Sequence, residues 1–269
     1  MKLLNKARNI FLTITIAILF LMYSCGNDPI VPSDPVGKLK FEFYHLIDNS
    51  KIVFDSLIYF NEAGNKYLIN EIQYFISDVE IHNDDGSSII LNEWNDIHYI
   101  DTDMESSQEY TFKEDISTGT YSAISFTFGI VDSKNESLMF VNPPHSFMFW
   151  PENLGGGYHY MKLNGKWINE DNLLAPFNFH LGRGQIYYSF PDSITDYIDN
   201  SFRINMQNVS YNIMADQTTT IVINMNMNKW FSNPNTYDHN YWGGDIMQNQ
   251  EAMSHAIENG HDVFTYTLK

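Results

Sequence analysis

The stretch that decides how this chain folds runs from residue 147 to residue 184. It reads Phe147-Met148-Phe149-Trp150-Pro151, then Gly155-Gly156-Gly157-Tyr158-His159-Tyr160-Met161, and then Phe177-Asn178-Phe179-His180-Leu181-Gly182. Aromatic and apolar residues alternate with polar ones here, which is the period-two pattern of β-strands. Twenty-one residues separate His159 from His180. We therefore expect two neighbouring strands with a loop between them, and a glycine hinge just before the first strand.

The same alternation recurs along the rest of the chain. The clearest runs are Leu39–His45, Tyr121–Ile130 and Thr219–Met227. The turn sequence Asn83-Asp84-Asp85-Gly86 predicts a hairpin, because Asp-Gly suits a tight two-residue turn. Only Ile246–Glu258 has the apolar spacing of a helix, and Asn259-Gly260 supplies its C-terminal cap. The sequence predicts an all-β fold, namely an antiparallel β-sandwich with a short C-terminal helix.

Composition narrows the class of protein. The chain has 269 residues, of which 43% are hydrophobic and 15% aromatic, so it can bury a sizeable core. Its formal net charge is −18. Nucleic-acid binding needs a basic face that meets phosphates, so nucleic acid is excluded as an expected partner.

The N-terminus has the pattern of a bacterial lipoprotein signal peptide over residues 1–24. Lys2, Lys6 and Arg8 form a basic region, and Ile10–Tyr23 is an apolar run shorter than a typical membrane span. The single cysteine, Cys25, follows a small residue, as in a relaxed lipobox. We expect cleavage before Cys25 and lipidation of its thiol, which would anchor the protein to a membrane by acyl chains.

Residues 25–37 are rich in proline and small polar residues, which is typical of an extended tether. Residues 38–269 then form one β-sandwich domain. Gly26 directly after the lipidated cysteine favours the outer membrane, by analogy with known sorting rules. We expect a protein of the bacterial cell envelope, on the periplasmic or the surface face.

A metal site is one interpretation of the central stretch. Histidine is the commonest metal ligand, and the methionine thioether is a soft donor that suits Cu⁺. His159 and His180 are the expected imidazole ligands. Met148 or Met161 is the soft third donor, with Met161 predicted on the same strand face as His159. The alternative is that these residues only fill the sandwich core.

The other histidines carry less weight. His45 lies on the Phe41–Phe43 face of its strand and is a reserve ligand. The remaining six are expected at the surface or at caps: His82, His98, His145, His239, His255 and His261.

The residue types suggest two further kinds of site. Asp101, Asp103 and Glu105 offer oxygen ligands for Ca²⁺, but the segment lacks the glycine and terminal glutamate of an EF-hand, so a solvated loop is favoured.

A glycan- or partner-binding platform is the second functional hypothesis, built on four tryptophans: Trp150, Trp167, Trp230 and Trp242. No Gly-x-Ser-x-Gly element is present and the lone cysteine is assigned to lipid, so a non-enzyme is expected.

Short motifs along the chain, in this order, resemble the MbnP-like family of exported lipoproteins over about residues 38–269. They are Gly64-Asn65-Lys66-Tyr67, Tyr74-Phe75-Ile76-Ser77-Asp78-Val79, Asp85-Gly86, Gly119-Thr120-Tyr121, Phe128-Gly129-Ile130-Val131-Asp132-Ser133, Met148-Phe149-Trp150, Gly157-Tyr158, Lys162-Leu163-Asn164-Gly165, Phe179-His180-Leu181-Gly182, Ile246-Met247 and Asp262-Val263-Phe264.

The family is named for a periplasmic partner of methanobactin, a copper-chelating peptide. The resemblance implies copper binding without catalysis, through histidines and an oxidised tryptophan (kynurenine) made by a partner dihaem peroxidase-like enzyme. His180 is the best match to the family's histidine motif, and Trp150 is the candidate for the modified tryptophan. His159 stands in a variant of the Gly-Tyr motif.

Overall fold

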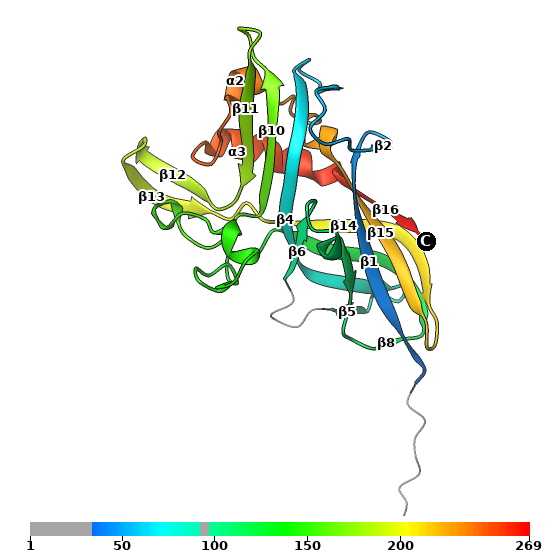
Figure 1. Ribbon diagram of the computed structural model, residues 1–269. Helices are drawn as coiled ribbons and strands as arrows, with labels where there is room; N and C mark the ends of the chain where they lie inside the picture. The colour runs from blue at the N-terminus through cyan, green and yellow to red at the C-terminus, as the bar shows by residue number, and fades with distance from the viewer. Residues whose placement is uncertain (1–33, 92–96) are drawn as a thin grey trace, which may run out of the picture. The chain divides into compact units, whose positions relative to one another are not determined.

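The computed structural model describes residues 34–91 and 97–269. The predicted signal peptide, Cys25 and the tether up to residue 33 lie outside these residues. Residues 35–269 form one unit built mainly from β-strands (Figure 1). Within the described residues, no helix combines the length and the apolar character needed to cross a membrane.

The larger sheet is antiparallel and is organised around one long strand. β4 pairs with β9 on one side and with β10 on the other, and β11 and β14 extend the sheet. The strands in order are β11 (Leu174–Leu181), β10 (Met161–Ile168), β4 (Lys66–Asn83), β9 (Gly119–Phe128) and β14 (Phe202–Ile213), with β3 (Tyr59–Phe60), β5 (Ser88–Ile90) and β6 (His98–Asp101) also paired with β4. The predicted hairpin at residues 83–86 is confirmed, because it joins β4 to β5.

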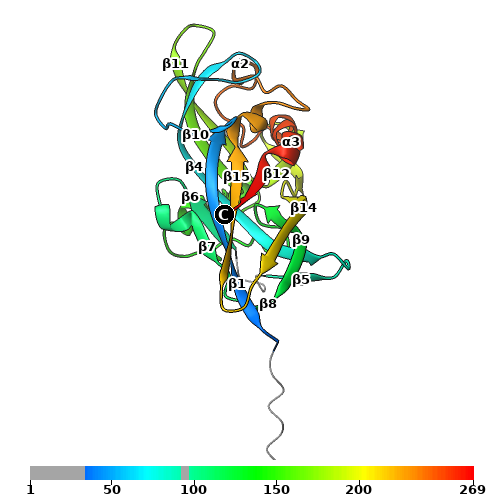
Figure 2. The ribbon, with the colours of Figure 1, turned by 90° about the vertical axis from the view of Figure 1, so that its right-hand side faces the viewer.

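The smaller sheet contains both ends of the described domain (Figure 2). Its strands in order are β16 (Phe264–Leu268), β15 (Thr218–Asn226), β1 (Val36–Ile47) and β2 (Ser50–Lys51), with β7 (Glu109–Thr111) and β8 (Ile116–Ser117) also paired with β1. The pairing of β1 with β15 is parallel, an exception to the predicted antiparallel pattern. A separate hairpin consists of β12 (Gly184–Ser189) and β13 (Ser193–Ile198).

Helical segments are short. In the described part of the chain they are α2 (His239–Trp242), α3 (Gln250–Asn259) and five 3₁₀ turns: η1 (Glu105–Ser107), η2 (His145–Met148), η3 (Glu152–Leu154), η4 (Met227–Phe231) and η5 (Gly260–Asp262). α3 is the predicted C-terminal helix, and it begins later than expected. The side chain of Asn249 caps it by accepting a hydrogen bond from the backbone N–H of Ala252 at 3.0 Å.

The main core fills the space between the two sheets. Phe41 and Ile223 from the smaller sheet and Tyr74 and Phe126 from the larger one are buried in one cluster. Burying a side chain of this size contributes roughly 1.5–3 kcal/mol. The predicted fold class, an antiparallel β-sandwich with a short C-terminal helix, is confirmed.

A second, smaller cluster lies on the other face of the large sheet. Tyr74 of β4 enters the main core, so its neighbour Phe75 points to the opposite face. There Phe75 packs with Tyr99, Ile130, Met148 and Tyr158. The long connection between β9 and β10 therefore folds back over the outer face of the sheet, and this connection carries half of the predicted metal site.

Candidate metal centre

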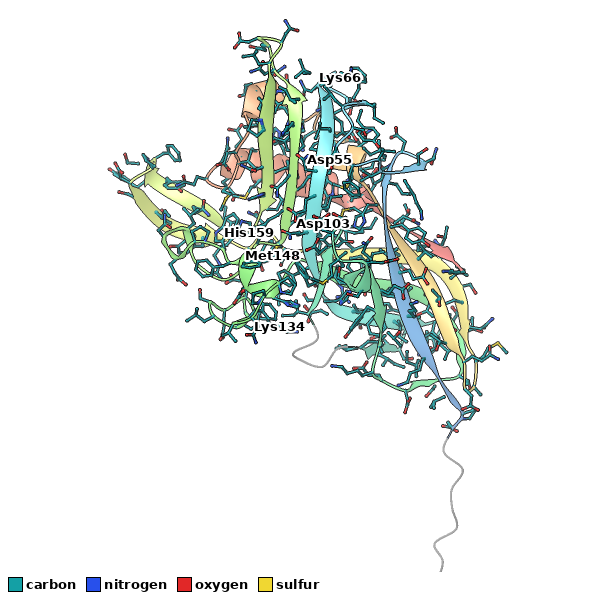
Figure 3. All side chains as sticks on the ribbon, viewed as in Figure 1. Asp55, Lys66, Asp103, Lys134, Met148 and His159 are labelled. Atoms are coloured by element: carbon teal, nitrogen blue, oxygen red, sulfur yellow. The ribbon has the colours of Figure 1, made fainter. Side chains whose placement is uncertain are left out.

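The glycine hinge sets the path of the chain into the site. Gly155, Gly156 and Gly157 all have positive φ angles, which a side chain would strain. The chain therefore reverses, and the backbone N–H of Trp150 donates to the carbonyl of Gly157 at 2.8 Å. This reversal lays Met148 beside His159 (Figure 3).

His159 is held by the Met148 carbonyl. Its Nδ1 lies 2.9 Å from that oxygen, and its backbone N–H donates to the same oxygen at 2.7 Å. A carbonyl oxygen can only accept, so Nδ1 carries the proton and Nε2 carries the free lone pair. The His159 side chain is buried, and Nε2 has no hydrogen-bond partner among the described residues.

His180 is held on the outer face of β11 by Asn164 of β10. Its Nε2 lies 2.8 Å from Asn164 Oδ1. Asn164 Nδ2 donates to Glu71 Oε2 at 3.1 Å, which fixes the orientation of the amide and leaves Oδ1 as the acceptor. Nε2 of His180 therefore carries the proton. Its Nδ1 is buried and has no hydrogen-bond partner in the described part of the chain.

The two imidazoles contact each other directly. Their ring centroids are 5.1 Å apart and their planes are close to perpendicular. Each ring has one nitrogen fixed by a hydrogen bond and one nitrogen with a free lone pair. A metal ion held by both rings would form one bond of about 2 Å to the free nitrogen of each.

Both histidines are kept neutral. Burial lowers the pKa of His180 to about 4, and the charge of Lys162 acts in the same direction. Burial also holds the pKa of His159 well below its usual value, with further contributions from His180 and Lys162. At neutral pH both free nitrogens are therefore unprotonated, which is the form that binds metals.

Trp150 forms the third wall of the site. Its ring lies edge-on to His159 with centroids 4.7 Å apart, and the side chain is fully buried. Its indole Nε1 donates to the Leu154 carbonyl at 3.1 Å. Gly182 passes directly against the ring, so an added Cβ there would lie 2.6 Å from Cε3 of Trp150.

The methionine donors predicted from the sequence lie elsewhere. The expected strand alternation of His159 and Met161 is wrong, because the chain bends at Tyr160 and buries both Tyr160 and Met161 in the main core. Met161 pairs with Leu181 and faces away from His180. Met148 packs its side chain into the second cluster, so its contribution to His159 is made by the backbone carbonyl.

His45 is not part of the pair. It lies on β1, buried, with its ring edge-on to Tyr74 of the main core at 5.7 Å. Its Nε2 has no hydrogen-bond partner within residues 34–91 and 97–269. His45 also lines a separate surface pocket of about 480 Å³ together with Lys51 and Glu105.

His239 was expected at the surface, and this prediction is wrong. It is fully buried, and its ring stacks on Phe177 with centroids 4.4 Å apart. Neither ring nitrogen has a hydrogen-bond partner among the residues that the structure describes. Burial lowers the pKa of His239 to about 3, so it is neutral.

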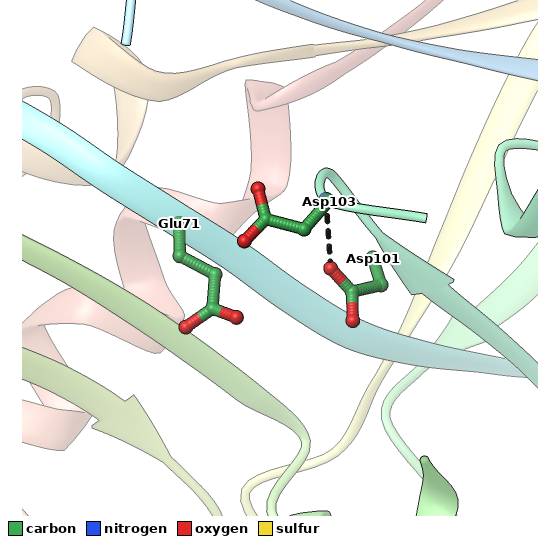
Figure 4. Close-up of side chains that lie close together, drawn as sticks. All are labelled: Glu71, Asp101 and Asp103. Carbon is green, nitrogen blue, oxygen red and sulfur yellow. Dashed lines mark hydrogen bonds between the residues drawn. The ribbon is translucent and has the colours of Figure 1, made fainter. Parts of the chain in front are cut away.

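A carboxylate cluster adjoins the site through its member Glu71, which accepts a hydrogen bond from Asn164. Figure 4 shows the cluster itself. It joins Glu71, Asp101 and Asp103, whereas Glu105 of the sequence-based hypothesis is not in it. Asp101 is already satisfied by the protein. It accepts from the backbone of Asp103 at 2.8 Å, from Tyr99 at 2.8 Å and from Gln73 at 3.1 Å. One oxygen from each of the three carboxylates lies within 4.8 Å of the others.

The predicted tryptophan platform is not present as a solvent-facing surface. Trp150, Trp167 and Trp230 are buried, and Trp242 is partly buried against the core. The hypothesis of a glycan- or partner-binding surface therefore loses its aromatic platform.

Two residues of the site were missed from the sequence, Lys162 and Asn164. Both stand on β10, and Lys162 lies directly opposite His180 in the strand register. The only sequence signal was their alternation in the Lys162-Leu163-Asn164-Gly165 motif, which places them on one strand face.

Fold and site together define an all-β protein that carries, on the outer face of its larger sheet, a histidine pair with two free ring nitrogens. The sequence matches the MbnP family over residues 36–251, and the chain belongs to that family. Among curated proteins, none matches this chain. The fold is similar to that of MbnP from Methylosinus trichosporium, with a TM-score of 0.57 and 12% sequence identity over 87% of this chain and 99% of that one.

Proposed function

We propose that this protein binds copper at His159 and His180 and sequesters it or hands it on, without catalysing a reaction. One observation carries the proposal, namely the contact between two neutral imidazoles, His159 buried and His180 partly buried, each with one buried nitrogen that has no hydrogen-bond partner among the described residues. A buried polar atom without a partner costs free energy, so a site with two of them favours a ligand that engages both.

The donor set fits copper. His159 would offer Nε2 and His180 would offer Nδ1, and imidazole nitrogens suit copper. The hydrogen bonds that the rings donate to the Met148 carbonyl and to Asn164 Oδ1 hold them in the tautomers that leave one nitrogen of each ring free, as metal sites commonly require. The methionine thioethers face the two apolar clusters, so we leave Met148 and Met161 out of the ligand set.

Trp150 is our candidate for the oxidised tryptophan that the family resemblance implies. It contacts His159, so a new donor atom on its ring system would stand beside the pair. A dihaem peroxidase-like partner is part of the same proposal. Peptide mass spectrometry of protein purified from its native envelope tests it, because an unmodified Trp150 in the copper-loaded protein would contradict it.

The location proposed for this activity is the bacterial envelope, with lipidated Cys25 as the anchor and the outer membrane as its site. Metabolic labelling with a fatty acid tests this part. We expect label in the unmodified chain and none in Cys25→Ser. Label in both would contradict it.

Copper binding is tested by anaerobic titration of the full chain with Cu⁺ against a chromogenic chelator. We expect one tightly held Cu⁺ in the unmodified chain and none in the double variant His159→Ala/His180→Ala. His255→Ala/His261→Ala is the matched control, since it also removes two histidines but lies on the C-terminal helical segment. Equal Cu⁺ in the two double variants would refute the site.

A further inference from the structure

Lys162 is the charged residue next to the histidine pair. It stands opposite His180 in the register of β10 and β11, so the two side chains share the outer face of the sheet. Its Nζ donates to the carbonyl of Phe147 at 2.5 Å. The next carbonyl along the chain, that of Met148, accepts from His159. The ammonium group therefore lies on the same sheet face as His180 and is held to the backbone stretch, Phe147–Met148, that also holds His159.

We propose that Lys162 makes the site selective for a monovalent soft cation, Cu⁺, over divalent cations such as Zn²⁺ and Cu²⁺. This inference rests on the proposed copper site. It assigns to Lys162 the discrimination between monovalent and divalent ions.

The need for such a residue follows from ligand chemistry. Nitrogen ligands bind Cu²⁺ and Zn²⁺ well, and the binding order of divalent metals does not protect an imidazole pair from them. Copper is otherwise selected by soft sulfur ligands, but Met148 and Met161 point into the apolar clusters. The selectivity must come from something other than a thioether.

A fixed positive charge supplies it. Coulomb repulsion scales with the charge of the bound ion, so Lys162 opposes a divalent ion twice as strongly as a monovalent ion at the same position. His159 is buried and His180 and Lys162 are partly buried, which weakens screening of this repulsion. Lys162 acts in the same way on protons. Together with burial, its charge lowers the pKa of both histidines, because it also repels the proton that would bind there.

The neighbouring carboxylate of Glu71 has the opposite charge to Lys162, and it is unchanged in the Lys162 variants. Glu71 acts on Lys162, where it opposes the lowering of the lysine pKa by burial and so supports the charged ammonium. Glu71 also lies one amide away from His180, since Asn164 bonds to Glu71 through Nδ2 and to the ring through Oδ1, so its negative charge partly offsets that of Lys162 at the site.

The test compares the dissociation constants of the full chain for Cu⁺ and for Zn²⁺, each measured against a chromogenic chelator. Lys162→Gln removes the charge and retains a donor for the Phe147 carbonyl. We expect it to tighten Zn²⁺ relative to Cu⁺ by roughly tenfold or more. Lys162→Arg keeps the charge and should keep the ratio of the unmodified chain. Lys166→Gln is the matched control, because Lys166 is an exposed lysine on the same strand.

Melting temperatures identify a variant that fails to fold, and Lys162→Met then replaces Lys162→Gln as the uncharged variant. An unchanged ratio in the folded uncharged variant overturns the inference, and so does a shift in Lys162→Arg as large as that in Lys162→Gln. In both cases Cu⁺ binding by the unmodified chain leaves the proposed copper site standing. Failure of the unmodified chain to bind Cu⁺ refutes the proposed function and this inference together.

Discussion

The Nε2 atom of His180 lies 2.8 Å from Oδ1 of Asn164, and this contact decides which nitrogen of the ring is free. Asn164 is in turn oriented by Glu71. Glu71, Asn164 and His180 are thus linked in series by two hydrogen bonds. Hydrogen bonds of this kind commonly orient histidines that bind metals.

Loss of this contact should weaken metal binding. Asn164→Leu removes the acceptor, so His180 can change tautomer and orientation. We expect the affinity for Cu⁺ to fall about 10- to 100-fold. In the metal-free protein, ¹⁵N NMR should show His180 protonated at Nε2 in the unmodified chain and a mixture of tautomers in the variant. Asn178→Leu is the control, because Asn178 is an exposed asparagine opposite Asn164 in the register. An unchanged Cu⁺ affinity in Asn164→Leu would show that Asn164 does not orient His180 for metal binding.

Acid should release copper only at low pH. A proton competes for the same lone pair as the metal, and competition begins as the pH approaches the pKa. Burial lowers the pKa of His180 to about 4, against about 6.5 for a free histidine. The apparent Cu⁺ affinity should therefore be constant between pH 7 and about pH 5 and should fall as the pH nears 4. A decline that begins near pH 6.5 would mean that the metal ligands are exposed histidines.

Crowding Trp150 should disturb both stability and binding. In Gly182→Ala the new Cβ would lie 2.6 Å from Cε3 of Trp150, and the backbone of Gly182 has no positive φ that would add strain of its own. We expect a loss of about 1–3 kcal/mol in the free energy of unfolding, measured by urea denaturation, and weaker Cu⁺ binding because the tryptophan contacts His159.

A double-mutant cycle provides the control for Gly182→Ala. Trp150→Phe removes the outer ring atoms that the new methyl group meets. The cost of Gly182→Ala should be smaller in that background. Equal costs in the two backgrounds would show that the destabilisation does not come from this contact.

His239 should make the fold sensitive to acid. Its pKa is lowered to about 3 in the folded state, against about 6.5 when unfolded, so the unfolded chain binds more protons between these values. Stability from this group is fully present above pH 6.5 and is lost as the pH falls towards 3, at up to about 1.4 kcal/mol per pH unit. His239→Phe should reduce that slope, because phenylalanine stacks on Phe177 without a titrating nitrogen.

The same variant should be at least as stable as the unmodified chain at pH 7, since it removes two buried ring nitrogens without partners. Urea denaturation between pH 4 and pH 7 measures both effects. A destabilised His239→Phe with an unchanged pH slope would show that the ring has hydrogen-bond partners in solution.

The sandwich could be predicted from the sequence because period-two alternation records which face of each strand is buried. Runs such as Leu39–His45 and Thr219–Met227 show this alternation clearly, and they correspond to β1 and β15 of the smaller sheet. The parallel pairing of β1 with β15 could not be predicted, because it joins strands far apart in the sequence and alternation contains no information on partners.

The histidine pair was predictable for the same reason, and its surroundings were not. His159 and His180 were expected on neighbouring strands, but His159 in fact precedes β10 and reaches His180 through the bend at Tyr160. That bend inverts the face expected for Met161. Lys162 and Asn164 join the site through strand register, which is fixed only when β10 pairs with β4 and β11.

X-ray absorption spectroscopy of the Cu⁺-loaded full chain tests the central claim most directly, because it identifies the atoms bound to the metal. The account predicts a first shell containing two imidazole nitrogens and no sulfur. It further predicts that this shell is lost in both His159→Ala and His180→Ala and retained in His45→Ala. A sulfur-containing shell, or an imidazole shell that survives either of the first two substitutions, would contradict it.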